Sequence, residues 1–193
     1  MLQKKENVIY LSVNKGSFWR YMGKDRQMES YNRVAGFVEK LSTEIRPIED
    51  QNVKFLLLRM VDGDEIYNIQ VPMYTSAGPD IIRHLAYAAE KKYDIVSGSM
   101  VAIEVYLREK EDRKYTNAAL YWGETKLEWD ALPNGMTREA GLDVLYDKIV
   151  KFLELLKSPG VNVGAPDDMP GDIPPGVYPG EDGTPENPFD GLR

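Results

Sequence analysis

The chain has 193 residues, of which 42% are hydrophobic and 28% are charged, and its formal net charge is -7. These values are typical of a globular protein and argue against a chain that is fibrous or disordered throughout. The absence of cysteine excludes disulfides, thiolate zinc sites and thiol catalysis. With no signal-peptide pattern and no long apolar run, we expect a soluble, cytoplasmic protein without membrane association.

The negative charge is concentrated in the last part of the sequence. Residues 158–193 hold seven acidic residues and one arginine, so they contribute -6 and the preceding residues only -1. The same segment holds 8 of the 12 prolines and 7 of the 16 glycines, a composition that cannot bury enough apolar surface to fold. We therefore divide the chain into a folded domain, residues 1–157, and a disordered acidic tail, residues 158–193.

The first predicted element is a β-hairpin within residues 1–30. Two β-prone runs, residues 8–13 and 17–22, flank the turn-forming Asn14-Lys15-Gly16. Residues 31–48 then alternate apolar and polar side chains around Gly36. We expect one long strand that bends at this glycine and ends at Pro47.

The clearest hairpin covers residues 53–73, where Asp62-Gly63-Asp64 separates two apolar runs and predicts a tight turn. A two-residue loop places one set of side chains on the core face: Leu56, Leu58, Tyr67, Ile69 and Val71. The opposite face then carries an unusual mixture of apolar, amide and cationic groups: Phe55, Leu57, Arg59, Ile66, Asn68 and Gln70. A three-residue loop would exchange the faces of one strand.

The rest of the folded region contains two helices and two strands. Pro79-Asp80 predicts the start of a helix that ends near Tyr93. Residues 100–108 and 115–122 alternate as strands do, and a charged loop, residues 109–114, separates them. A second amphipathic helix covers residues 137–157 and is capped by Thr137.

Three strands, a helix and two further strands follow one another in the order of an OB-fold. The expected fold class is therefore mainly β with α. We expect a five-stranded OB-fold barrel with a helix between strands 3 and 4, an N-terminal hairpin and an extra C-terminal helix. This last helix would pack on the barrel or on another subunit, as in a homo-oligomer.

Sequence motifs for catalysis are weak. His84 is the only histidine and lies within a helix, so a Ser-His-Asp arrangement has no alternative base, and we interpret it as a surface or boundary residue. Asp62, Asp64 and Glu65 offer oxygen ligands for Mg²⁺, but turn geometry accounts for the Asp-Gly pair. The sequence has no Walker-type loop and no GxGxxG motif. We expect no enzymatic activity, no cofactor and no metal.

Aromatic side chains interleaved with basic ones form the strongest functional pattern, in residues 15–24 and 106–115. Bases stack on aromatic rings while Lys and Arg hold phosphates, so the combination is typical of proteins that bind single-stranded nucleic acid. In an OB-fold, strands two and three and the loop before the last strand form the ligand cleft. The candidate nucleic-acid-binding residues are Lys15, Phe18, Trp19, Arg20, Tyr21, Phe55, Arg59, Asn68, Gln70, Tyr106, Arg108, Arg113, Lys114 and Tyr115.

An OB-fold body followed by a Gly/Pro-rich acidic tail with Pro188-Phe189 near its end resembles the single-stranded DNA-binding proteins of bacteria and their phages. The resemblance is architectural, covers the whole chain and favours a divergent phage-type member. It implies that the protein coats single-stranded DNA during replication, recombination and repair. It also implies that Pro188 and Phe189 dock onto replication and repair proteins, and that the tail competes with DNA for the cleft.

Other interpretations stay open from the sequence alone. The interleaved aromatic residues would instead fill the core while the charges solvate a loop. The nearly neutral folded region also permits a protein-interaction or virion module that uses the same barrel without nucleic acid. An enzyme on this scaffold would need convergent carboxylates or a metal, which the sequence does not indicate.

Overall fold

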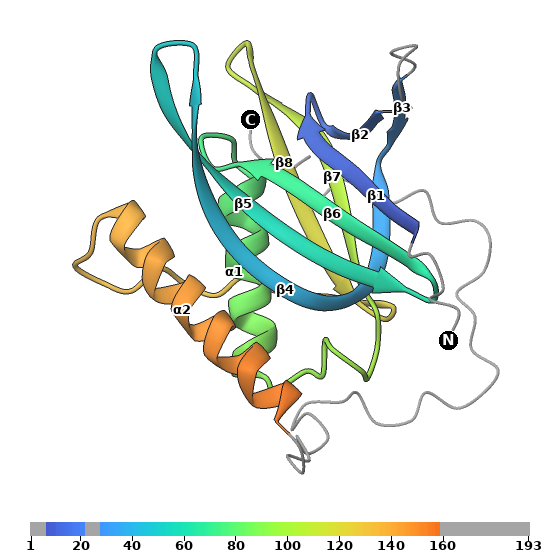
Figure 1. Cartoon of the computed structure of the whole chain (residues 1–193). Coiled ribbons are helices and arrows are strands. Elements are labelled where there is room, and N and C mark those ends of the chain that lie inside the picture. The colour runs from blue at the N-terminus through green and yellow to red at the C-terminus, as the bar shows by residue number, and fades with distance from the viewer. Residues whose placement is uncertain (1–6, 22–27, 159–193) are drawn as a thin grey trace, which may run out of the picture.

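The computed structural model describes residues 7–21 and 28–158, which form a nine-stranded sheet and two helices (Figure 1). The strands are β1 (Asn7–Asn14), β2 (Ser17–Tyr21), β3 (Met28–Tyr31), β4 (Arg33–Ile48), β5 (Gln51–Asp62), β6 (Glu65–Pro72), β7 (Val101–Lys110), β8 (Arg113–Trp122) and β9 (Thr125–Lys126). The helices are α1 (Ala77–Glu90) and α2 (Arg138–Lys157).

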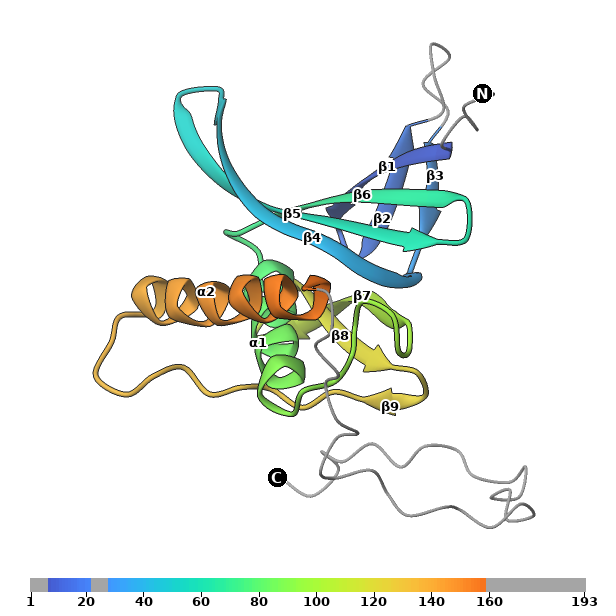
Figure 2. The same ribbon diagram turned by 60° about the horizontal axis from the view of Figure 1, so that its bottom comes forward.

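The strand order is β3-β2-β1-β6-β5-β4-β7-β8-β9. Neighbouring strands are antiparallel except β1 and β6, which are parallel. β3 ends at Tyr31 and β4 begins at Arg33, so the edge strand β3 continues almost directly into β4, an interior strand of the same sheet. The sheet is therefore strongly curled, as Figure 2 shows.

A mainly β fold with two helices is confirmed, but the closed five-stranded barrel is wrong. The expected order of elements is present as β4, β5, β6, α1, β7 and β8. Within the described residues, however, β6 and β8 do not pair, and β6 pairs instead with β1 of the N-terminal hairpin. The physical reason is the apolar inner side of this hairpin, because Ile9, Leu11, Val13 and Phe18 are buried by joining the sheet.

The predicted two-residue turn between β5 and β6 is confirmed. Asp62 lies opposite Glu65 and Leu58 opposite Ile69, so Gly63 and Asp64 form the loop. Gly63 has a φ of 57°, which a glycine adopts without steric cost. The predicted faces follow from this register, and Leu56, Leu58, Ile69 and Val71 are at most 1% exposed.

The predicted charged loop at residues 109–114 is wrong, because both strands continue through it. β7 extends to Lys110 and β8 begins at Arg113, which leaves Glu111 and Asp112 as the turn. Their φ angles are 50° and 62°, the left-handed pair that a type I′ hairpin turn requires. Two acidic residues are an uncommon choice for this turn, so the sequence indicated a longer loop.

β4 bends later than predicted. The register with β5 shifts between Val38 and Lys40, which marks a β-bulge, and the strand continues through Pro47 to Ile48. Gly36 has a different role. A Cβ at this position would lie 2.9 Å from the carbonyl oxygen of Val61, so the close approach of β5 requires a glycine.

α1 covers an open edge of the sheet. β9 pairs only with Tyr121 and Trp122, so within the described residues the earlier part of β8 has no strand on that side. There the buried carboxylate of Asp80 accepts hydrogen bonds from the Ala118 N–H at 3.1 Å and the Asn117 side chain at 3.0 Å. Asp80 thus satisfies polar groups of an edge strand that water does not reach.

His84 is fully buried, so its interpretation as a surface or boundary residue is wrong. Its Nδ1 lies 2.9 Å from the Glu128 carbonyl oxygen, and its ring meets Trp129 edge-on at 5.6 Å. The segment that follows β9 therefore covers this face of α1. Burial lowers the pKa of His84, which favours the neutral imidazole.

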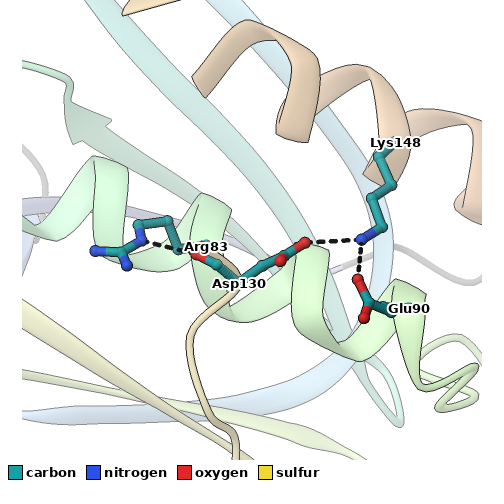
Figure 3. A network of polar contacts seen from close by, with 4 residues as sticks. All are labelled: Arg83, Glu90, Asp130 and Lys148. Atoms are coloured by element: carbon teal, nitrogen blue, oxygen red, sulfur yellow. Dashed lines mark hydrogen bonds and ion pairs between the residues drawn. The ribbon is translucent and has the colours of Figure 1, made fainter. Parts of the chain in front are cut away.

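The same segment links the two helices through a polar network (Figure 3). Arg83 Nε donates to the Asp130 carbonyl oxygen at 3.0 Å, and Lys148 Nζ lies 2.7 Å from both Asp130 Oδ2 and Glu90 Oε2. The predicted cap of α2 is confirmed, since Thr137 Oγ1 accepts from the Ala140 N–H. Neither described helix combines the length and apolar character that a membrane span requires.

Candidate nucleic-acid interface

A row of polar and aromatic side chains crosses four strands on the outer face of the curled sheet. Tyr10 of β1 lies opposite Asn68 of β6, Asn68 opposite Arg59 of β5, and Arg59 opposite Lys40 of β4. Alternate residues of a strand point to opposite faces. The row faces away from the core because the residues next to it in the strands are buried: Leu11, Ile69, Leu58 and Leu41.

A second row runs beside the first, and we call the two rows together the outer wall. Its members are paired in register across β2, β1, β6, β5 and β4: Trp19, Ser12, Gln70, Leu57 and Ser42. The outer wall is hollowed by a pocket of about 520 Å³ whose lining includes Tyr10, Asn68, Gln70 and Arg59. Tyr10 is 68% exposed, so its ring is available to a ligand.

The arginines at the outer wall are engaged with carboxylates. Arg59 Nε donates to Glu39 Oε2 at 2.6 Å. Arg46 donates to Glu44 at 2.5 Å and to Gln70 Oε1 at 2.6 Å. The hydrogen bond between Glu44 and Arg46 lowers the pKa of Glu44 and raises that of Arg46. The surface is therefore close to neutral, and its guanidinium groups are held in place beside the amides.

The two segments with interleaved aromatic and basic residues lie against each other. The N–H of Gly16 donates to Thr116 Oγ1 at 3.2 Å. A Cβ on Gly16 would lie 2.7 Å from the Leu107 backbone nitrogen, so the turn between β1 and β2 touches the hairpin of β7 and β8 directly. This contact brings the exposed Lys15 next to the second predicted segment. Sequence reasoning named both segments but did not predict their contact.

The β7–β8 hairpin carries predicted residues on its surface. Tyr106 is 42% and Tyr115 is 38% exposed, and Arg108 lies opposite Tyr115. Lys114 forms an ion pair with Glu109 at 3.0 Å. Within the described residues, no carboxylate lies at ion-pair distance from Arg108 or from its neighbour in the hairpin, Arg113. These two guanidinium groups are accessible to phosphate.

Two of the predicted aromatic residues are buried, Phe18 in the core and Phe55 on the outer face of the sheet. Phe18 has no exposed surface and Phe55 is 4% exposed, so neither ring can stack on a base in this structure. Phe55 lies beneath Arg46, whose guanidinium carbon is 5.8 Å from the ring centre. The alternation of β2 explains Phe18, because Phe18 and Trp19 must point to opposite faces. We remove both phenylalanines from the candidate interface.

Arg20 is also separated from the outer wall. It lies opposite Leu11 on the inner face and lines a different pocket of about 320 Å³ with Tyr31 and Tyr67. The hydrogen bond that Tyr67 donates to Glu65 raises the pKa of Tyr67 to about 12. Asp62 and Glu65 border this pocket as well, at the end of the hairpin turn. The polar groups here partner one another, which favours a structural role.

Three predicted residues lie wholly or partly outside the described part of the chain. Tyr21 ends β2 opposite Met28, but its side chain is not described. Pro188 and Phe189 fall in the segment after Ser158 and are not described at all. The binding role that we assigned to each of them stays a prediction.

Sequence reasoning missed Tyr10, Lys40 and Arg46. The even-numbered polar positions Lys40, Ser42 and Arg46 share one face of a strand, and this alternation was visible in the sequence. Tyr10 had no such signal, because its position beside Asn68 depends on the parallel pairing of β1 with β6. Local patterns do not predict a pairing between segments so far apart.

Comparisons with known proteins identify no relative for this arrangement. No protein-family model matches the chain, and no match was found among curated proteins or solved structures.

Proposed function

We propose that the protein is a non-enzymatic, OB-fold-type single-stranded DNA-binding protein that acts in the cytoplasm during replication, recombination or repair. The observation that carries the proposal is the row formed by Tyr10, Asn68, Arg59 and Lys40. It combines an exposed aromatic ring, an amide and two cations on one face. Single-stranded nucleic acid is bound by this combination of groups.

The order of the central elements supports the proposal. If β4, β5 and β6 correspond to the first three strands of an OB-fold, the outer wall includes the face of strands two and three, which binds ligands in that fold. Bases would stack on Tyr10 and Trp19, and amides of Asn68 and Gln70 would contact base edges. Phosphates would lie along the cations Lys15, Lys40, Arg59, Arg108 and Arg113.

The paired arginines set the expected strength of binding. A phosphate that approaches Arg59 must compete with Glu39, which lies 2.6 Å away. The affinity should therefore be modest, depend strongly on salt and vary little with base sequence. Stacking should contribute more to specificity for single strands than the ion pairs do.

A fluorescence anisotropy titration with a labelled oligo-dT, at low and at moderate salt, tests this proposal. Tyr10→Ala should weaken binding about 5- to 150-fold, the range that the loss of one stacking contact gives. Tyr74→Ala is the matched control, because Tyr74 is 76% exposed but lies outside the outer wall. Absence of binding by the wild-type protein at low salt, or equal loss in both variants, would contradict the proposal.

The acidic tail is the second part of this proposal. Residues 158–193 contribute -6 to the net charge, so in charge they resemble a polyanion such as DNA. We propose that the tail competes with DNA and that Pro188 and Phe189 recruit replication and repair proteins. In the same titration, deletion of residues 159–193 should tighten DNA binding at low salt. An unchanged or weaker affinity would count against the competition.

A protein-interaction or virion module is the alternative function. It is favoured by one observation, the engagement of Arg59 with Glu39 and of Arg46 with Glu44, which leaves the outer wall close to neutral. A neutral surface with the exposed Tyr10 suits a protein partner better than a polyanion. The titration at low salt separates the two functions, because a protein-binding surface gives no saturable signal with oligo-dT.

A further inference from the structure

The hairpin of β4 and β5 extends beyond the rest of the sheet, and its β4 edge is open there (Figure 1). On this side of β4, β7 pairs only with residues 33–36. Further along, the Val38 N–H donates to the Ile95 carbonyl oxygen at 2.8 Å, and the Leu41 carbonyl oxygen lies 3.5 Å from the Tyr146 hydroxyl. Beyond Leu41, no hydrogen bond to this edge is present within the described residues.

Successive residues of β4 direct their backbone N–H and C=O groups alternately toward β5 and toward the open edge. The Leu41 carbonyl points away from β5, so Thr43, Ile45 and Pro47 direct their backbone groups the same way. Lys54 gives independent support. It lies opposite Ile45, and its carbonyl oxygen accepts from the Met73 N–H on the far side of β5. The backbone of Ile45 is thus turned away from β5 and toward the open edge.

The sequence of this edge is self-complementary in an antiparallel arrangement. It reads Thr43-Glu44-Ile45-Arg46-Pro47. When two such edges meet with Ile45 opposite its counterpart, Glu44 of each faces Arg46 of the other. Opposite charges at facing positions stabilise strand pairs, and like charges destabilise them. Ile45 is 65% exposed, so pairing would also cover an apolar side chain that the chain leaves open.

We propose that this edge of β4, Thr43–Pro47, pairs antiparallel with the same edge of a second copy, centred on Ile45. Proline fixes the register, because Pro47 has no N–H and can only accept. In the centred register its carbonyl accepts from the Thr43 N–H of the second copy, and the two Ile45 residues exchange hydrogen bonds. A register centred on Pro47 would lack backbone N–H donors at its centre. A register centred on Thr43 would bring the second copy against Leu41, whose carbonyl oxygen already contacts Tyr146.

The resulting dimer would be small in area and dependent on concentration. The pairing edge is five residues long, well short of the surface that a permanent interface buries. Glu44 and Arg46 share the face of Ser42 and Lys40, so the pairing would continue the outer wall from one copy into the other. The pairing does not depend on DNA binding, and either proposal can fail without the other.

Analytical ultracentrifugation of the full chain over a wide concentration range tests the proposal. The wild type should change from monomer to dimer as its concentration rises. Ile45→Lys places two lysines opposite each other and should raise the dimer dissociation constant about tenfold or more. Met100→Lys, which adds the same charge at an exposed apolar position outside this edge, should leave it unchanged. A wild type that stays monomeric, or a dimer that Ile45→Lys does not weaken, would overturn the proposal.

Complementary charge variants identify the register. Glu44→Arg alone and Arg46→Glu alone place like charges opposite each other, so each variant should be monomeric by itself. An equal mixture of the two should form a heterodimer, because one edge is then basic and the other acidic. Mixing cannot restore the Glu44–Arg46 ion pair within either chain, so recovery reports contact between chains. A mixture that stays monomeric would refute the Ile45-centred pairing.

Discussion

Replacement of Asp80 by alanine tests how α1 is fixed to the open edge of β8. Asp80 Oδ2 accepts hydrogen bonds from the Ala118 N–H at 3.1 Å and from Asn117 Nδ2 at 3.0 Å. All three residues are buried, so water cannot replace the lost acceptor without opening the contact. The substitution therefore leaves two buried donors without partners while it also removes a charge from the interior.

The expected cost follows from these two donors. A buried donor left unsatisfied costs about 1–3 kcal/mol, so the two together cost about 2–6 kcal/mol. Removal of a buried carboxylate offsets part of this cost, because its desolvation no longer opposes folding. We expect Asp80→Ala to lower the free energy of unfolding by about 2–4 kcal/mol. Asp80→Asn keeps one acceptor oxygen and should cost about 1 kcal/mol.

Urea denaturation followed by tryptophan fluorescence measures both variants. Asp147→Ala on the exposed side of α2 is the control and should change the free energy of unfolding by less than about 0.5 kcal/mol. The order of stability should be wild type, Asp80→Asn and then Asp80→Ala. If Asp80→Ala unfolds within the range of the control, Asp80 does not hold the β8 edge and the reasoning is refuted.

Two further predictions concern His84 and Gly16. Burial lowers the pKa of His84 from its usual 6.5, so the unfolded chain binds more protons and the free energy of unfolding should fall as the pH drops below about 6.5. His84→Gln should flatten this dependence in urea titrations, and an equally steep dependence would contradict the assignment. Gly16→Ala should cost about 1–2 kcal/mol for the backbone at φ 73° and more for the contact with Leu107. Gly63 has a φ of 57° and open space around it, so Gly63→Ala measures the backbone cost alone. If Gly16→Ala and Gly63→Ala lower the free energy of unfolding equally, the turn at Gly16 does not contact Leu107.

Local signals in the sequence predicted the local structure well. Asp62-Gly63-Asp64 set the register of β5 with β6, and this register placed Arg59, Asn68 and Gln70 on one face. Thr137 marked the start of α2. Each of these features depends on a few consecutive residues, which is why the sequence indicates them directly.

The predictions that were wrong concern features that depend on contacts between segments far apart in the sequence. Nothing in residues 8–13 indicates that β1 joins β6 in parallel, yet this pairing replaces the closed barrel and brings Tyr10 to the outer wall. The burial of Phe18 and His84 likewise depends on elements that come much later in the chain. Glu111 and Asp112 adopt a turn that favours other residues, so the sequence predicted a loop over residues 109–114 where the two strands in fact continue to a two-residue turn.

The parallel pairing of β1 with β6 has a consequence for the order of folding. Asn7 and Glu65, at one end of this ladder, are separated by 58 positions in the sequence, whereas β1 with β2 and β5 with β6 are joined by short turns. Closure of so long a loop costs more conformational entropy than closure of a hairpin. Contacts between residues far apart in the sequence also slow folding. We therefore expect both hairpins to form first and the β1–β6 ladder to form late, which makes the completion of the outer wall one of the last events in folding.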